Sequence, residues 1–150
     1  MLNYIKGTIV DVNGSNIILE SNSIGYEIKT PNASNFKLNS EIIVYTYLHV
    51  KEDMIELYGF KCKEEKNFFC QLISVKGLGP KSALAILASS EINKTVDAIN
   101  SGNFKYLQQF PGIGIKASQQ IILDLRGKIN LNSNLKTTNP KIESIKNALK

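Results

Sequence analysis

The sequence has no tryptophan, one histidine, one arginine and two cysteines among its 150 residues. His49, Cys62 and Cys70 are too few to supply the four ligands of a structural zinc site, and a single pair of cysteines is not a disulfide framework. We therefore expect two reduced structural thiols and a structural histidine. No metal and no cofactor are predicted.

Long apolar runs are also missing. The start, MLNYIKGTIVDV, contains no apolar run of signal-peptide length. Nothing in the chain approaches the ~18 consecutive apolar residues that a membrane helix needs. The sequence therefore predicts a cytoplasmic protein without a membrane partner.

Positive charge exceeds negative charge, because Lys and Arg number 18 against 13 Asp and Glu, with a net charge of +5 and a pI near 9.1. All of these cations except Arg126 are lysines. A basic balance favours partners that carry negative charge, nucleic acid first. A solvated basic surface with no specific partner is the alternative at this modest charge.

The hydrophobic period divides the chain into an α+β protein of two domains. Residues 1–62 contain five strand-like runs with turn residues between them: YIKGTIVDV, NIILE, IGYEIKT, EIIVYTYLHV and MIELYGF. Five short strands indicate a small closed barrel, either an OB-fold or an SH3-like barrel. Residues 63–128 change to a helical period and predict four or five short helices with one extra turn.

The composition changes again after residue 128. Residues 129–140, INLNSNLKTTNP, are polar and predict a flexible linker. Residues 141–150, KIESIKNALK, place Ile142, Ile145 and Leu149 on one face of an amphipathic helix. A lone helix of this length is marginal in water, so it either docks on something or begins a further domain.

Two glycine-rich stretches, VKGLGPK and FPGIGIK, repeat with an offset of 35 residues. The matched positions are Gly77 and Gly112, Leu78 and Ile113, Gly79 and Gly114, and Lys81 and Lys116. Each stretch joins two predicted helices. Glycine at both loop positions permits positive φ and a close approach of the backbone to a ligand, while the apolar residue between them can fill the gap between the helices.

This arrangement leaves unpaired N–H groups at the start of the second helix, where phosphate binds, and the lysine adds a full charge. The spacing differs from a P-loop, because the fifth residue after Gly77 is Ser82, and a helix precedes each loop where a dinucleotide site has a strand. Two helical hairpins in register favour phosphate binding on both strands of a duplex, which positions a protein without reading sequence. An ordinary helical turn is the alternative for either stretch alone.

A third stretch, KED at residues 51–53, is the predicted tip of a β-hairpin. Glu52 and Asp53 are adjacent acids on an otherwise basic protein. They lack a third carboxylate or a histidine to hold a catalytic metal, so no catalytic residue is predicted. The tip is either a solvated turn or a point of repulsion that keeps DNA strands apart.

Together these features resemble the RuvA family, the Holliday-junction-binding subunit of the bacterial branch-migration complex. The motifs are I-x-G-x-I at the start, G-Y-E at residues 25–27, V-K-E-D followed by L-Y-G-F, both glycine hairpins, and A-L-A-I-L at residues 83–87. The resemblance runs from residue 1 to about residue 128.

The resemblance implies an OB-fold domain, a tandem helix-hairpin-helix domain and a non-catalytic role in recombination and DNA repair. It implies four-way junction DNA as the ligand and a homotetramer, or an octamer of two tetramers on DNA. Glu52 and Asp53 would form an acidic pin that separates strands. The other implied partners are a separate ATP-driven motor of the RuvB type, which fits the missing P-loop, and a junction resolvase.

This sequence departs from the family pattern in two places. Ile115 stands where relatives often have lysine, so the second hairpin is expected to depend more on backbone amides, with Arg126 and Lys128 either compensating or capping a helix C-terminus. Relatives also continue into a three-helix third domain that contacts the motor, of which residues 141–150 resemble only the first helix. The expectation for the chain as given is junction binding without efficient motor recruitment.

Two other functions fit parts of this pattern. A general duplex-binding protein would use the hairpins alone and would not prefer a junction to linear DNA. A nuclease would use Glu52 and Asp53 and would need magnesium.

Overall fold

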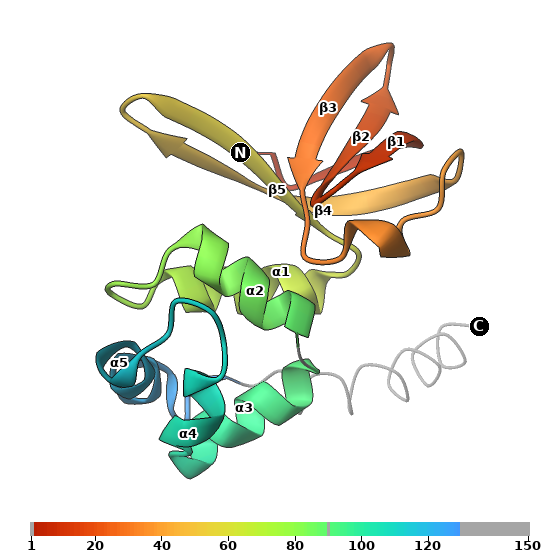
Figure 1. The fold of residues 1–150 in the computed structure, drawn as a ribbon. Helices are drawn as coiled ribbons and strands as arrows, with labels where there is room; N and C mark the ends of the chain where they lie inside the picture. The colour runs from red at the N-terminus through yellow and green to blue at the C-terminus, as the bar shows by residue number, and fades with distance from the viewer. Residues whose placement is uncertain (1, 90, 130–150) are drawn as a thin grey trace, which may run out of the picture.

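The computed structural model describes residues 2–89 and 91–129, in which a β-barrel is followed by a layer of helices (Figure 1). The barrel contains β1 (Tyr4–Asn13), β2 (Asn16–Ser21), β3 (Ile24–Lys29), β4 (Glu41–Lys51) and β5 (Met54–Phe60), with a short 3₁₀ helix, η1 (Ala33–Asn35), before β4. The helices are α1 (Lys63–Ile73), α2 (Pro80–Ser89), α3 (Ile92–Ser101), α4 (Phe104–Gln108) and α5 (Ile115–Leu125). The predicted class, a five-stranded barrel followed by short helices, is confirmed.

The strands close in the order β1-β2-β3-β5-β4. All neighbours are antiparallel except β3 and β5, which meet in parallel at Lys29 and Tyr58. The barrel is therefore OB-like, the first of the two barrel types that the strand count allowed. Alternate apolar residues fill its interior, as period-two patterning requires: Ile5, Ile9, Ile17, Leu19, Ile28 and Val44.

Close packing between strands explains why two of the sequence motifs contain glycine. A Cβ on Gly59, in L-Y-G-F, would lie 2.5 Å from side-chain carbons of both Ile28 and Val44. A Cβ on Gly7, in I-x-G-x-I, would lie 2.2 Å from the carbonyl oxygen of Glu20. Any larger residue would push neighbouring strands apart, so these motifs are requirements of barrel closure.

The outer face of β4 and β5 joins the barrel to the helices. Phe60 and Phe69 are both fully buried, with ring centroids 4.8 Å apart. Tyr58 and Tyr47 pack against the same Phe69 ring, at 5.2 and 5.7 Å. Because Tyr58 and Phe60 belong to the core of the helical layer, α1 is held on the strands that carry the acidic tip.

The helical layer has one continuous core that extends to Ile129, which is 5% exposed. Ile129 is the first residue of the predicted linker; the rest of that linker and residues 141–150 lie outside the described residues. Within the described part of the chain, every helix is too short or too polar to cross a membrane.

The residues considered for metal or thiol chemistry are dispersed. Cys62 and Cys70 are both free and half-buried, and burial raises the pKa of each thiol. His49 is half-buried between the rings of Tyr47 and Tyr58, and its Nε2 has no hydrogen-bond partner among the described residues. Among residues 2–89 and 91–129, no three His, Cys, Asp or Glu side chains gather as a metal ion would require.

Candidate nucleic-acid interface

Both glycine-rich stretches form helical hairpins. The first connects α1 to α2 and the second connects α4 to α5. The chain turns at the first glycine of each loop, where φ is +89° at Gly77 and +80° at Gly112. Side chains with a Cβ adopt such values at a cost, so glycine is required at these two positions.

The two loops have the same backbone hydrogen bonds, each displaced by the repeat of 35 residues. Leu78 N–H donates to the Val75 carbonyl at 3.1 Å, and Ile113 N–H donates to the Phe110 carbonyl at 3.2 Å. The next helix then begins with a bond from Ala83 to Gly79 at 3.1 Å and from Ser118 to Gly114 at 3.0 Å. The sequence repeat is therefore a repeat of backbone conformation.

The apolar residue between the glycines fixes each loop to the core. Leu78 and Ile113 are each 5% exposed and belong to the core of the helical layer. The predicted role of these two residues, filling the gap between the helices, agrees with this burial. Next to these buried side chains, the loop backbone is exposed at Gly79 and Gly114.

The second glycine of each loop leaves open space in front of the helix N-terminus. A Cβ on Gly79 or Gly114 would meet no atom within 4 Å. No side chain caps α5 at Gly114, so the first N–H groups of this helix are free to bind an anion. Lys81 and Lys116 are exposed beside these N-termini.

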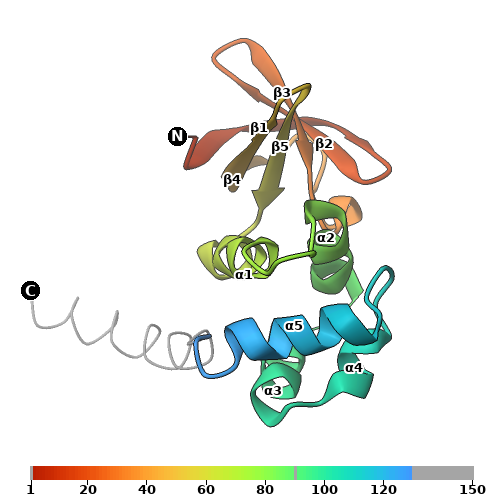
Figure 2. The same cartoon turned by 90° about the vertical axis from the view of Figure 1, so that its left-hand side faces the viewer.

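The two loops lie close together. Ser82, in the first turn of α2, has its Oγ 2.9 Å from the position of a Cβ on Gly112. Figure 2 shows the loop before α5 pointing up toward α2, with the loop between α1 and α2 facing the viewer. The fold thus brings together two equivalent loops that are 35 residues apart in the sequence.

The structure corrects one detail of the sequence interpretation. Only the first glycine of each pair has positive φ; Gly79 and Gly114 do not. The second glycine is needed for clearance in front of the amides, whereas the first is needed for the turn. The sequence pattern did not predict that Ser82 lies against the loop of the other hairpin.

The residues that depart from the family pattern lie at different ends of α5. Ile115 is 64% exposed at the N-terminus of the helix, beside its uncapped first amides. Arg126 caps the opposite end, and its Nε donates to the Asn100 carbonyl at 3.1 Å. Since α5 is about 16 Å long, Arg126 has the C-terminal role rather than a place beside the loop.

The acidic tip lies at the end of a projecting ribbon. Pairing of β4 with β1 ends at Tyr45, and β5 pairs with β3 only at Tyr58, so residues 48–57 pair only with one another. Figure 1 shows this hairpin projecting away from the rest of the barrel. Glu52 and Asp53 are exposed at its tip, and neither forms an ion pair with another described residue.

One face of the ribbon is apolar and open. Val50 and Ile55 are directly paired across the two strands and are 58% and 72% exposed. Leu48 and Leu57 form the next pair on the same face. A two-stranded ribbon is marginally stable by itself, so this face is a candidate for contact with another molecule. The sequence reasoning considered the acids and missed these apolar neighbours.

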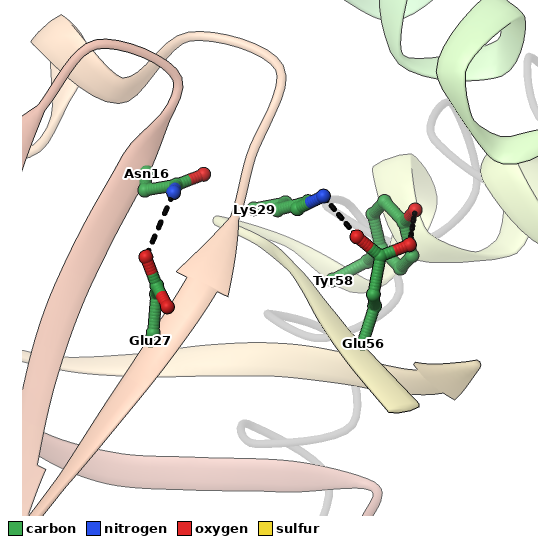
Figure 3. Close-up of polar contacts among 5 residues, drawn as sticks. All are labelled: Asn16, Glu27, Lys29, Glu56 and Tyr58. Atoms are coloured by element: carbon green, nitrogen blue, oxygen red, sulfur yellow. Dashed lines mark hydrogen bonds and ion pairs between the residues drawn. The ribbon is translucent and has the colours of Figure 1, made fainter. Parts of the chain in front are cut away.

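Polar contacts hold the root of the ribbon to the barrel (Figure 3). Lys29 of β3 forms an ion pair with Glu56, and Tyr58 O–H donates to the other oxygen of the same carboxylate at 3.0 Å. The hydrogen bond from Lys29 holds the pKa of Glu56 below its ordinary value. Burial, followed by the bond to Glu56, raises the pKa of Tyr58 to about 12. A second contact, from Asn16 to Glu27 at 3.0 Å, joins β2 to β3.

Family models match both parts of the chain. The RuvA N-terminal domain matches residues 1–59, which covers the barrel and the acidic tip. A SAM-like helix-hairpin-helix tandem matches residues 69–128, which contains both glycine hairpins. The two matches account separately for the two structural layers.

Curated relatives extend the similarity across both layers. The chain is 50% identical over 129 residues to the Holliday junction branch migration complex subunit RuvA of Acholeplasma laidlawii (strain PG-8A), covering 86% of this chain and 69% of the relative. It is also 50% identical over 134 residues to the protein of the same name from Staphylococcus saprophyticus, covering 88% of this chain and 67% of the relative. The chain therefore belongs to the RuvA family.

Proposed function

We propose that the chain is a non-catalytic DNA-binding subunit that holds a four-way junction in an open planar form and directs an ATP-driven RuvB motor to it. The single observation that carries this proposal is the pair of equivalent hairpins with adjacent loops, combined with a projecting acidic tip on the same chain. The names of the relatives, subunits of a Holliday junction branch migration complex, support the same function.

The hairpins would hold the duplex arms. Each offers free amides at a helix N-terminus and one lysine at the matched position, which suits a phosphate group. The proposed DNA-binding residues are Gly77, Leu78, Gly79, Lys81, Gly112, Ile113, Gly114 and Lys116, with Leu78 and Ile113 acting as buried supports. Contacts of this kind position the protein on any sequence, as an enzyme complex that moves along DNA requires.

The acidic tip would act on strands at the crossover. Glu52 and Asp53 carry two negative charges on a ribbon that extends beyond the barrel. Phosphates are repelled by these carboxylates, so a duplex cannot continue through the tip. Strands separated there would pass into neighbouring arms as the motor moves the junction. The chemistry of ATP hydrolysis would belong to the RuvB partner.

Domain boundaries, a further partner and a location follow from this function. We place the first domain at residues 1–62 and the hairpin domain at residues 63–129, because Ile129 is packed in its core. The linker would then follow at residues 130–140, and the start of a motor-binding domain at 141–150. A junction held open in a plane exposes its crossover strands to a junction resolvase. Work on chromosomal DNA fits a cytoplasmic location in a bacterium.

A homotetramer is the oligomer that matches four arms. Fourfold symmetry requires a surface that each subunit offers to its neighbour, and the open pair Val50 and Ile55 supplies apolar area beside the acidic tip. Contact there would bring four tips together at the centre of the junction.

The oligomer is tested by measuring solution mass with and without junction DNA. Ile55→Lys is expected to shift a tetramer toward smaller species, whereas Leu38→Lys, at a side chain that is 52% exposed in a loop, should leave the mass unchanged. A tetramer that becomes an octamer on DNA would indicate two tetramers around one junction. A monomer under all conditions contradicts the proposed symmetry.

Junction opening is tested by fluorescence transfer between dyes on the arm ends of a four-way junction in magnesium. Binding should give equal transfer for all adjacent pairs of arms, because a square plane makes them equivalent. Unequal pairs that remain as they were in free DNA would contradict the proposal and favour a general duplex binder. Cleaved strands that depend on magnesium and on Glu52 and Asp53 would indicate a nuclease.

A further inference from the structure

The outer face of β1 and β4 carries aromatic and basic side chains, of which Tyr4 and Lys6 are exposed and Tyr45 is half-buried. Tyr4 and Tyr45 are direct cross-strand partners, and Lys6 and Ile43 form the next such pair on the same face. Tyr4 is 56% exposed and Ile43 is 38% exposed. We call Tyr4, Lys6, Ile43 and Tyr45 the tyrosine face.

Strand alternation fixes the direction of this face. The intervening pair, Ile5 and Val44, is buried inside the barrel at 8% and 0% exposure. Tyr4 and Tyr45 therefore point away from the barrel interior and lie beside each other on its outer surface. Directly paired residues have Cβ atoms about 5 Å apart, which brings both rings within reach of one short ligand.

Lysines border the tyrosine face. Lys63, the first residue of α1, has its Nζ 5.9 Å from the centre of the Tyr45 ring. Lys66, one turn further along α1, donates to Asn3 Oδ1 at 2.7 Å and is held next to the start of β1. Lys6 is exposed within the face itself. The next pair on this side of the two strands is Thr8 and Glu41, so one carboxylate also borders the tyrosine face.

We infer that the tyrosine face binds single-stranded DNA. Aromatic rings that stack with bases, beside cations that track the backbone, are the combination that single-strand-binding surfaces use. A duplex keeps its bases stacked inside, so it cannot offer them to Tyr4 and Tyr45. The inference rests on the proposed function, since a subunit that separates strands creates unpaired nucleotides.

The location makes this site separate from the first hairpin. Lys63 begins α1, and the first hairpin loop follows the other end of the same helix, about 15 Å away. Variants in one site can therefore be made without altering the other. A site for unpaired strand at this distance would retain a separated strand while the hairpins hold the arms.

The test measures fluorescence anisotropy of a labelled oligothymidylate of about 12 nucleotides with the whole chain. Tyr4→Ala should weaken binding by about 5-fold or more, the effect of losing one base stack, whereas Tyr4→Phe should retain binding. Lys6→Gln should reduce the slope of log affinity against log salt by about 0.7, the value for one phosphate on a single strand. Because Tyr4 and Lys6 are exposed, these variants should fold normally.

The control variants are Lys37→Gln and Leu38→Ala, at two consecutive exposed residues in the loop before β4. Both variants should leave oligothymidylate binding unchanged. Lys116→Gln should weaken binding of linear duplex and not of oligothymidylate, and Tyr4→Ala should do the reverse. That crossed pattern separates failure of this inference from failure of the proposed function.

Two results would overturn the inference. One is unchanged oligothymidylate affinity in Tyr4→Ala; if the solution mass of that variant is altered as well, the face is a contact between copies of the chain. The other is complete loss of oligothymidylate binding in Lys116→Gln, which would assign single strands to the hairpins.

Discussion

The two hairpins have the same loop backbone and different surroundings. Each turns at a glycine with positive φ, buries one apolar side chain and starts the next helix with an equivalent hydrogen bond. The first has Lys76 and Pro80 where the second has Pro111 and Ile115. Proline has no N–H, so the first hairpin lacks an amide donor at the helix start, whereas the second lacks one before its first glycine. The first hairpin also has one lysine more.

Their supports also differ. The first hairpin begins with α1, which packs on β4 and β5, whereas the second begins with the five-residue α4, which packs on α3 and α5. The two hairpins keep the same loop geometry, while their charge, the position of the missing amide donor and their attachment to the rest of the protein differ. We therefore expect the first hairpin to depend more on lysine charge and the second more on backbone amides.

The largest expected effect concerns the turning glycines. Gly77→Ala should lower the free energy of unfolding by about 1 kcal/mol, the cost of a side chain at positive φ. Gly112→Ala should lower it by about 2 kcal/mol, because its Cβ would also crowd Ser82 Oγ at 2.9 Å. Urea denaturation measures both changes.

A double-mutant cycle isolates that crowding. Ser82→Ala should recover part of the loss in Gly112→Ala and none of the loss in Gly77→Ala. Gly14→Ala, at φ +61° with open space around its Cβ, is the control for strain alone. If Gly77→Ala and Gly112→Ala lower the free energy of unfolding equally, and Ser82→Ala changes neither loss, then Ser82 does not crowd Gly112 and the proposed contact between the loops is contradicted.

The sequence predicted these hairpins because their determinants are local. In each repeat the first glycine makes the turn, the apolar residue is buried between the helices, and the second glycine and the lysine lie at the start of the next helix. The barrel followed similarly from period-two runs. Contacts between distant segments were not predicted: neither the approach of Ser82 to Gly112 nor the burial of Phe60 under Phe69 leaves a local pattern. The open pair Val50 and Ile55 was missed because strand alternation alone does not show where a barrel ends.

A smaller effect is expected at the second glycines, on binding rather than stability. Gly79→Ala and Gly114→Ala should change the free energy of unfolding by less than about 0.5 kcal/mol, since neither Cβ meets another atom. Affinity for linear duplex should fall by about 10-fold, equal to 1.4 kcal/mol, because the methyl group stands in front of the amides. Gly114→Ala should have the larger effect. Unchanged affinity in both variants would mean that phosphate does not approach these amides.

Lysine substitutions sharpen the difference in charge. Lys81→Gln and Lys116→Gln should each reduce the salt slope for duplex binding by about 0.9. Lys76→Gln should reduce it by the same amount, and the second hairpin has no matching lysine because Pro111 takes that position. Ile115→Lys should increase the slope by the same amount and tighten binding. These slopes come from affinities measured over a range of salt concentrations. A slope that Ile115→Lys leaves unchanged would contradict the proposed position of this residue beside phosphate.

The smallest effect concerns pH at the ribbon root, a region outside both hairpins. The pKa of Glu56 is lowered in the folded state, so its contribution to stability is present above pH 4.5 and is lost as pH falls through the folded-state pKa. Glu56→Gln should remove this part of the acid dependence. The check is urea denaturation at several pH values, with Glu20→Gln, an exposed acid without an ion pair among the described residues, as the control.

The most direct test of the account is a gel-shift titration with salt that compares a four-way junction with linear duplex of the same length and sequence. The account predicts a preference for the junction that persists as salt rises, and a reduced preference in Glu52→Gln with Asp53→Asn because linear duplex then binds better. Equal binding of both DNAs that weakens in parallel with salt, and is tightened uniformly by the same substitutions, would contradict it.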